Sequence, residues 1–260
     1  MEPIYNFKIT KIKGNKKFEF DDTLIREIRA DIYLNGKRKI SMMVTPVDMD
    51  ALAMGYLISE GLIEKLEDIQ KIKIDETKIY VDAKINYKQT QKLSEEAIIV
   101  SGCGKSITAN VDINPEKINA AKINSKKTVS VKEISTQMQN FYNSCPLYEK
   151  TGCVHTARFF VDENNFFDAE DIAQHATVDK AIGKALLKGF SGKDGIMLVS
   201  GRLSSEMIVK AVMHKIPILI SRTATTCLGA KIADFFNLTL VGFARGDKMN
   251  IYTHPERIIV

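Results

Sequence analysis

The chain has 260 residues, of which 45% are hydrophobic and 27% charged, a balance typical of a soluble globular protein and not of a disordered, collagen-like or coiled-coil chain. The net charge of +5 is not concentrated in a basic domain or tail, so nothing favours nucleic-acid binding. No apolar run approaches the roughly 18 residues of a membrane span, and the N-terminus lacks a signal-peptide pattern. We therefore expect a cytoplasmic protein with neither a membrane nor a nucleic-acid partner, whose cysteines are thiols.

The N-terminal part of the chain predicts strands and one packed helix. Residues 4–12 and 27–44 alternate apolar and polar positions, and Asn35-Gly36 interrupts the second run as a hairpin turn does. Thr45-Pro46 predicts the start of a helix, with the threonine as N-cap and the proline as the first helical residue. Residues 67–84 predict two more short strands.

Residues 85–127 are rich in Lys, Asn and Ser, and we interpret an apolar burst at 97–100 as a strand leading into a mobile loop. That loop contains Cys103 between two glycines, which argues for an exposed sulfur, and Lys105 would favour the reactive thiolate. On residues alone this interpretation is evenly balanced against a small buried residue at a strand end. The other three cysteines have no basic, glycine-rich setting and are predicted to be structural: Cys145, Cys153 and Cys227.

The C-terminal part changes pattern. Ser130 and Glu133 predict the N-terminal cap of a helix that runs to about residue 143. Beyond Val154, apolar strands alternate with helices: strands at 155–161, 195–199, 216–220 and 238–243, and helices at 176–190, from 204 and from 226. This alternation predicts an α/β fold with a mixed, mostly parallel sheet covered on both faces. We expect two units, a strand-rich N-terminal subdomain (1–125) and an α/β cofactor-binding domain (126–260).

Three predicted strands end in segments that suit a phosphate-bearing ligand. Ligands of such sheets bind beyond the carboxyl ends of the strands, and each segment carries an arginine and small residues. The segments are Ser200-Gly201-Arg202, Ser221-Arg222-Thr223 and Phe243-Ala244-Arg245-Gly246. Arginine binds phosphate through two parallel hydrogen bonds, and a helix start offers free amides. We expect the three segments to converge on one cleft.

The stretch from Glu170 to Lys180 is a second polar cluster. Asp171, His175 and Asp179 recur at spacing four, so in a helix they would share one face and could bind a ligand or act as acid and base. From spacing alone, helix capping and a solvated face are the more common explanation. No Cys-x-x-Cys and no deaminase zinc signature is present, so we expect no zinc.

Several of these motifs occur together, in the same order, in one family. They are Asn35-Gly36, Thr45-Pro46, Gly55 to Gly61, Glu170 to Lys180 (with Ala173 and Gln174 in place of Gly-Arg), Ser200 to Met207, and Gly242 to Ile258. In these residues the chain resembles the formate dehydrogenase accessory sulfurtransferase family (FdhD/NarQ).

The resemblance implies a function and a fold. Such proteins accept sulfur as a persulfide from a cysteine desulfurase. They pass it to the molybdenum or tungsten of a bis-molybdopterin guanine dinucleotide cofactor before its insertion into apo formate dehydrogenase. The resemblance also implies a three-layer α/β/α core similar to cytidine deaminase without its zinc, a homodimer, and a cofactor-binding stretch at Phe243, Ala244, Arg245, Gly246, Asp247 and Lys248.

The cysteine loop departs from the family pattern. The family loop reads Cys-Gly-x-Cys-Gly, whereas this chain has one cysteine there, Cys103, which aligns with either family position. Persulfide exchange needs only one nucleophile on the carrier, so a sulfur carrier is the leading hypothesis. The alternatives are a chaperone that delivers the cofactor without sulfurating it and a nucleotide-binding regulatory protein. Binding of GDP as a cofactor analogue is expected in the strand-end cleft.

Overall fold

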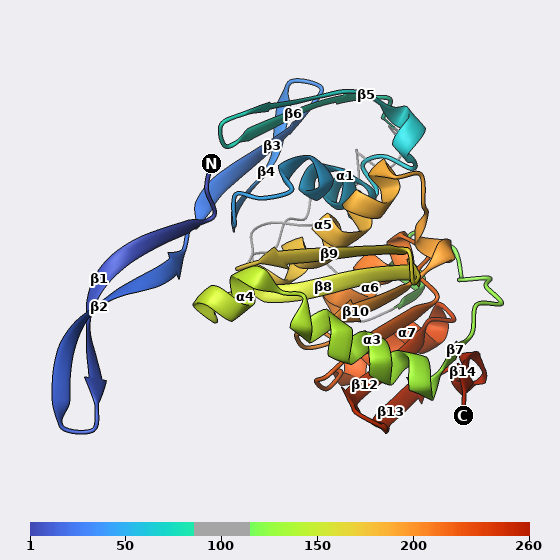
Figure 1. Ribbon diagram of the computed structural model, residues 1–260. Coiled ribbons are helices and arrows are strands. Elements are labelled where there is room, and N and C mark those ends of the chain that lie inside the picture. The colour runs from blue at the N-terminus through green and yellow to red at the C-terminus, as the bar shows by residue number, and fades with distance from the viewer. Residues whose placement is uncertain (86–114) are drawn as a thin grey trace.

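The structure, a computed structural model, describes residues 1–85 and 115–260, and its centre is a six-stranded sheet (Figure 1). The strand order is β13-β12-β11-β10-β8-β9. The bounds are β8 (His155–Asp162), β9 (Asn165–Asp171), β10 (Ile196–Val199), β11 (Ile218–Ser221), β12 (Thr239–Arg245) and β13 (Lys248–Thr253). The predicted α/β class with a mixed sheet is confirmed, but the sheet is not mostly parallel. Only β10, β11 and β12 run parallel, because an antiparallel hairpin closes the sheet on each side.

Helices cover both faces of this sheet, which gives the three predicted layers. One face packs against α5 (Gln174–Leu187), α6 (Ser205–Met213) and α7 (Cys227–Phe235), and the other against α3 (Val131–Asn143) (Figure 1). In β10, Met197 and Val199 join the first apolar cluster, whereas Ile196 and Leu198 join the second. Because successive strand residues face opposite sides, a sheet buried on both sides needs this unbroken apolar run. The predicted cap of α3 is present, with the Glu133 amide donating to Ser130 Oγ over 3.0 Å.

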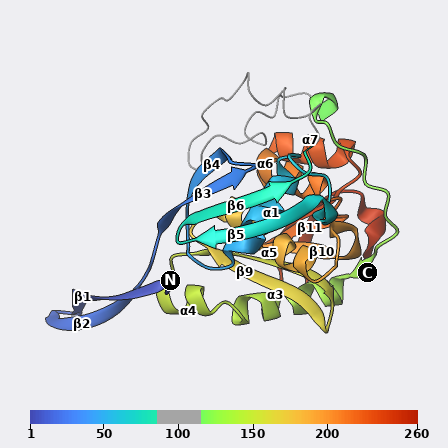
Figure 2. The same cartoon turned by 90° about the horizontal axis from the view of Figure 1, so that it is seen from above.

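A smaller sheet and one helix form the N-terminal region, as predicted. The sheet has the order β4-β3-β6-β5, with β3 (Ile28–Leu34), β4 (Lys37–Val44), β5 (Ile69–Asp75) and β6 (Lys78–Ala83). Helix α1 (Met49–Ser59) lies between this sheet and α5 (Figures 1 and 2). Asn35 and Gly36 both have positive φ, 50° and 75°, as the two-residue hairpin turn requires. One apolar core contains residues of α1, which precedes the expected boundary at residue 125, and of α5, which follows it. The division into two units stays a prediction.

Helices α1 and α5 pack backbone to backbone. A Cβ atom at Gly55 would lie 2.0 Å from the carbonyl oxygen of Asp179, and one at Gly183 would lie 2.0 Å from that of Ala51. Each helix therefore needs glycine at the crossing point.

The helix start predicted at Thr45-Pro46 is wrong. Helix α1 begins at Met49, three residues after Pro46, and follows Asp48, which has φ 50° and makes no side-chain cap. Thr45 is buried, its amide donates to Asp171 Oδ2 over 3.1 Å, and its carbonyl accepts from Lys180 Nζ over 2.8 Å. The Thr45 hydroxyl accepts from the amide of Ile172, so tertiary contacts with the end of β9 and with α5 occupy the groups that an N-cap would use.

The first strands form an arm that leaves the body of the molecule (Figures 1 and 2). Strands β1 (Ile4–Lys13) and β2 (Lys16–Ile25) pair antiparallel over their whole length as a separate two-stranded sheet. The sequence predicts β1 but not β2.

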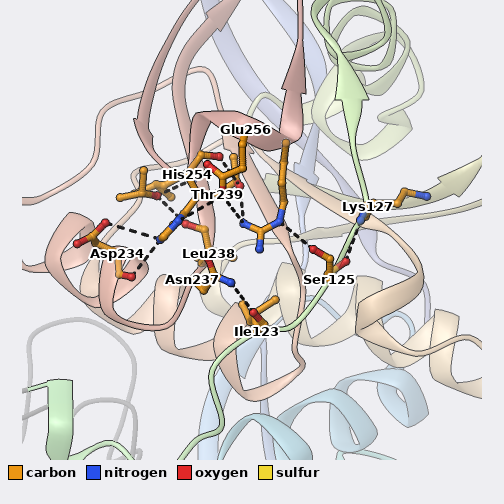
Figure 3. Close-up of polar contacts among 12 residues, drawn as sticks. Ile123, Ser125, Lys127, Asp234, Asn237, Leu238, Thr239, His254 and Glu256 are labelled. Carbon is orange, nitrogen blue, oxygen red and sulfur yellow. Dashed lines mark hydrogen bonds and ion pairs between the residues drawn. The ribbon is translucent and has the colours of Figure 1, made fainter.

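The C-terminus is tied to the segment that precedes α3 (Figure 3). Arg257 donates from its guanidinium to Thr239 Oγ1 (3.0 Å) and to the carbonyl of Ser125 (3.3 Å), and Asn237 Nδ2 donates to the carbonyl of Ile123 (2.7 Å). Strand β14 (Ile258–Ile259) then pairs parallel with β7 (Val129–Ser130). The closing sequence pattern therefore has a structural role here. Across the described parts of the chain, no helix is long and apolar enough to cross a membrane.

Candidate functional site

The three predicted ligand segments lie against one another. Ser221 Oγ and Thr223 Oγ1 each donate to the carbonyl of Gly201 over 2.7 Å, which joins the second segment to the first. The Arg245 guanidinium donates to the carbonyl of Arg222 over 3.3 Å, which joins the third segment to the second. We call residues 200–202, 221–223 and 243–246 together the strand-end cluster.

Chain topology explains why these segments meet. Strands β10, β11 and β12 are parallel neighbours, so their carboxyl ends share one edge of the sheet. Helices α6 and α7 begin shortly after the ends of β10 and β11, with Ser204 and Thr226 as their N-caps. The free amides and positive dipole ends of both helices therefore lie at the same edge, which suits an anionic ligand.

The three arginines of the strand-end cluster are available to a ligand, whereas Ser221 is fully buried and its hydroxyl already donates to Gly201. Arg202, Arg222 and Arg245 are exposed, and the Arg222 guanidinium lies 4.5 Å from the ring centre of Tyr142 on α3. Burial, opposed by Arg222, raises the pKa of Tyr142 to about 12, so this phenol stays protonated. Phe243 has φ 52° at an irregularity in the β12–β13 pairing and is 40% exposed. A bulky residue in the left-handed region marks a constrained backbone, of the kind that concentrates at binding sites.

Two histidines extend the cluster towards β8 and α5. His155 Nδ1 lies 3.4 Å from Ser200 Oγ, and His175 Nδ1 lies 3.0 Å from Glu206 Oε2. Burial, then the positive charges of Arg202 and His175, lower the pKa of His155 and favour its neutral form. Gln174 Nε2 donates to the carbonyl of Arg202 over 2.7 Å, which joins the start of α5 to the strand-end cluster.

Sequence reasoning missed His155, and it named Gln174 only as part of the stretch from Glu170 to Lys180 without a site role. His155 begins β8, and β8 runs antiparallel to β10, so the amino end of β8 lies beside the carboxyl end of β10. The only sequence indication was the position of His155 at the start of a predicted strand, because strand order cannot be read from local pattern.

The remaining predicted residues lie elsewhere. Asp247 is exposed in the turn from β12 to β13, and Lys248 begins β13, also exposed. Cys103 and Lys105 lie outside the described residues.

The other three cysteines do not share one environment. Cys145 is buried, and its pKa is raised to about 12, chiefly by burial. Cys153 and Cys227 are exposed, so the expectation that all three are structural fits Cys145 alone.

The model of the FdhD/NarQ family matches residues 25–259. The chain belongs to the FdhD/NarQ family. It is 44% identical to the sulfur carrier protein FdhD of Wolinella succinogenes over 242 residues, covering 92% of this chain and 84% of that protein. It is 31% identical to the sulfur carrier protein FdhD of Bacillus subtilis, covering 97% and 99% of the two chains. The crystal structure of a protein from Desulfotalea psychrophila described as a formate dehydrogenase accessory protein is also similar, with a TM-score of 0.80, 27% identity, and 99% and 100% of the two chains covered.

Two acidic residues of the FdhD/NarQ stretch from Glu170 to Lys180 point into the protein instead of towards the strand-end cluster. Asp171 is fully buried and accepts hydrogen bonds from Lys180 Nζ and from the amide of Ala173. Burial raises the pKa of Asp171 and lowers that of Lys180, and their mutual attraction opposes both shifts. A ligand could reach this carboxylate only by breaking a buried ion pair.

Asp179 is also buried, at the junction of α1, α5 and α6. Its carboxylate accepts from Lys210 Nζ over 2.8 and 2.9 Å and from Ser59 Oγ over 2.7 Å. Asp171 ends β9, so the interpretation that Asp171, His175 and Asp179 share one helical face is wrong. Of these three side chains, only His175 lies at the strand-end cluster.

Proposed function

We propose that this FdhD/NarQ protein is a sulfur carrier that supports formate dehydrogenase. The observation that carries this proposal is the 44% identity, over most of both chains, to a protein named as a sulfur carrier. Relatives with 30–31% identity carry the same name.

In the proposed mechanism Cys103 carries the sulfur as a persulfide, and the protein acts as a sulfurtransferase. Its thiolate would attack the outer sulfur of a persulfide on a cysteine desulfurase. A new S–S bond forms on Cys103, the S–S bond on the donor breaks, and the donor cysteine leaves as a thiolate. Lys105 would favour the attacking thiolate electrostatically.

The proposed acceptor is the molybdenum or tungsten of a bis-molybdopterin guanine dinucleotide cofactor, bound as a substrate. The strand-end cluster supports this choice because its arginines suit a diphosphate and two helix N-termini add amide donors. Phe243 offers an exposed aromatic ring beside them, which can stack against a guanine base. GDP is then the minimal analogue of the nucleotide half of this substrate.

The proposed partners follow from the two halves of the reaction. A cysteine desulfurase supplies the sulfur, apo formate dehydrogenase receives the sulfurated cofactor, and the carrier acts as a homodimer. The single cysteine of the loop motivates a second candidate, a chaperone that delivers the cofactor without sulfurating it. The sulfur carrier names of the relatives favour the first candidate.

Mass spectrometry after incubation with a desulfurase and cysteine tests the proposal. We expect a mass gain of one sulfur atom on Cys103 and none in Cys103→Ala. Cys153→Ser and Cys227→Ser are the matched controls, because both thiols are exposed, and each should keep the wild-type gain. Sulfur on either of those residues with Cys103 unmodified would overturn the assignment. GDP binding without any persulfide would favour the chaperone.

A further inference from the structure

The arm formed by β1 and β2 has one apolar face and one polar face. In an antiparallel pair, directly opposite residues share a face and successive rungs alternate. The rungs Tyr5–Leu24, Phe7–Asp22, Ile9–Phe20 and Lys11–Phe18 therefore lie on one face. The other face carries the rungs Asn6–Thr23, Lys8–Asp21, Thr10–Glu19 and Ile12–Lys17, with the apolar rung Ile4–Ile25 at its base.

The side chains of the polar face have partners within the arm, whereas large side chains of the apolar face remain exposed. On the polar face, Thr23 donates to Asn6 over 3.3 Å and Lys8 pairs with Glu19 at 3.8 Å. On the apolar face five large side chains remain 39–56% exposed: Tyr5, Phe7, Phe18, Phe20 and Leu24. An isolated two-stranded hairpin is marginally stable in water, so a face of this kind indicates a partner surface.

We propose that the apolar face of the arm docks on the same face of a second copy of this chain, in a two-fold arrangement. These five side chains, together with the less exposed Ile9, supply on the order of 500 Å² per copy, because a buried aromatic covers roughly 150–250 Å². Two such faces together reach about 1,000 Å², the lower limit for a specific interface. A two-fold contact buries the same patch on both partners and needs no further surface.

Charge on the apolar face selects the direction of packing. Lys11, Lys13 and Lys16 lie on this face towards the tip, whereas Asp22 lies on it near the base. Packing tip against tip would bring the lysines of both copies together. Packing tip against base separates the lysines and brings Lys11 of each copy beside Asp22 of the other. It also leaves the two bodies at opposite ends of the paired arms.

The contact between Lys11 and Asp22 cannot form within one arm. Their rungs are separated by a further rung, about 13 Å along the ribbon. Within its own arm, Lys11 instead lies over the Phe20 ring, 4.2 Å from the ring centre. A charge exchange between these two positions therefore reports on contact between copies.

Sedimentation of the full chain over a range of concentrations tests the proposal. Phe7→Thr/Phe20→Thr keeps strand-forming residues and should raise the dissociation constant of the dimer at least about tenfold. Ile12→Thr is the matched control, because Ile12 is 65% exposed on the polar face, and it should leave the constant unchanged. Lys11→Asp and Asp22→Lys should each weaken the dimer, and the double exchange should restore it.

Three results would overturn the proposal. One is a monomer at every concentration, and another is a dimer that none of these variants weakens. The third is a monomer whose arm binds anionic phospholipid vesicles and loses that binding in Phe7→Thr/Phe20→Thr, which would make the partner a lipid surface. The inference adds an interface to the homodimer of the proposed function. A monomer that still takes up sulfur on Cys103 would refute the arm contact and leave the sulfur carrier intact.

Discussion

Two regions of the molecule use charged residues in opposite ways. Asp179 pairs with Lys210 where α1, α5 and α6 meet, and Asp171 at the end of β9 pairs with Lys180 of α5, all of them buried. We call these four residues the buried ion pairs. In the strand-end cluster, the three arginines are exposed. Both regions belong to motifs of the same family, so motif membership does not distinguish a residue that holds the fold from one that meets a ligand.

The physical difference lies in what the protein offers each charge. A buried charge needs a partner and hydrogen bonds inside the fold. Removing one member of a buried ion pair therefore leaves the other member as an uncompensated charge. An exposed arginine keeps its water shell and exchanges it for a ligand at little cost to the fold. We therefore expect substitutions of the buried ion pairs to change stability, and substitutions in the strand-end cluster to change binding.

The largest expected effect comes from Lys180→Met. The variant keeps the apolar stem but leaves the Asp171 carboxylate unpaired in the interior, which should lower the free energy of unfolding by about 3–5 kcal/mol. Urea denaturation with an unchanged m-value measures it. Lys184→Met, one turn further along α5, is the control. Its half-exposed pair with Asp48 at 3.2 Å should contribute only about 0–1 kcal/mol. Equal effects of the two variants would contradict the distinction.

The next effect is a pH dependence at His214. This residue is buried beside Ser59, and its Nε2 lies 3.2 Å from the carbonyl of Gly55. Burial lowers its pKa from 6.5 to about 4, opposed by Asp179. The unfolded chain therefore binds a proton that the folded chain does not. Stability present above pH 6.5 is lost as the pH falls through 4, by about 3 kcal/mol in total.

His214→Gln removes this titration, so its free energy of unfolding should fall less steeply between pH 6.5 and 4 than that of the wild type. Ser59→Ala is the control, because it removes a hydrogen-bond partner and keeps the histidine. Parallel pH profiles for wild type and His214→Gln would show that His214 does not govern this window.

A smaller effect is expected where α1 and α5 cross. Gly55→Ala places a Cβ 2.0 Å from the Asp179 carbonyl oxygen and forces the helices apart. Overpacking costs about 1–3 kcal/mol, and the gain of about 1 kcal/mol in helix propensity offsets only part of it. Gly183→Ala presses on the same crossing, so the double variant should cost less than the sum of the two. Strict additivity would show that the helices absorb each change locally.

Sequence patterns predicted the elements well where side-chain period and local turn chemistry decide the structure. Asn35-Gly36 gave the hairpin and Ser130 the start of α3, because both depend only on neighbouring residues. Strand β9 escaped prediction because Asp168, Glu170 and Asp171 interrupt its apolar pattern, and each is satisfied by a residue of another element or loop. Thr45 was misassigned for the same reason, since Asp171 and Lys180 bind its backbone.

The candidate site was predicted in part. Parallel strands bring their carboxyl ends to one edge, so the meeting of the segments at Gly201, Ser221 and Arg245 followed from the α/β pattern. The inward orientation of Asp179 could not be predicted, because a spacing of four residues on a helix does not tell which face is buried. The position of His155 required the antiparallel pairing of β8 with β10.

The smallest expected effect on stability, and the sharpest on function, comes from Arg202→Ala. Arg202 is exposed, so the free energy of unfolding should stay within about 0.5 kcal/mol of the wild type. GDP affinity should fall by roughly 10- to 100-fold, because a charge-assisted hydrogen bond to phosphate contributes about 1.5–3 kcal/mol. Arg202→Lys keeps the charge but loses the forked geometry, and its affinity should be intermediate.

Calorimetry with GDP and ADP completes this comparison. GDP should bind the wild type roughly 5- to 150-fold more tightly than ADP, because a donor placed for guanine O6 would face the amino group of adenine. Arg38→Ala, an exposed arginine on β4, is the control and should leave both affinities unchanged. Equal affinity for the two nucleotides, or an unchanged GDP affinity in both Arg202→Ala and Arg245→Ala, would contradict the proposal that the nucleotide binds at the strand-end cluster. The exposed arginines there would then have no assigned ligand, while the buried ion pairs would keep their structural role.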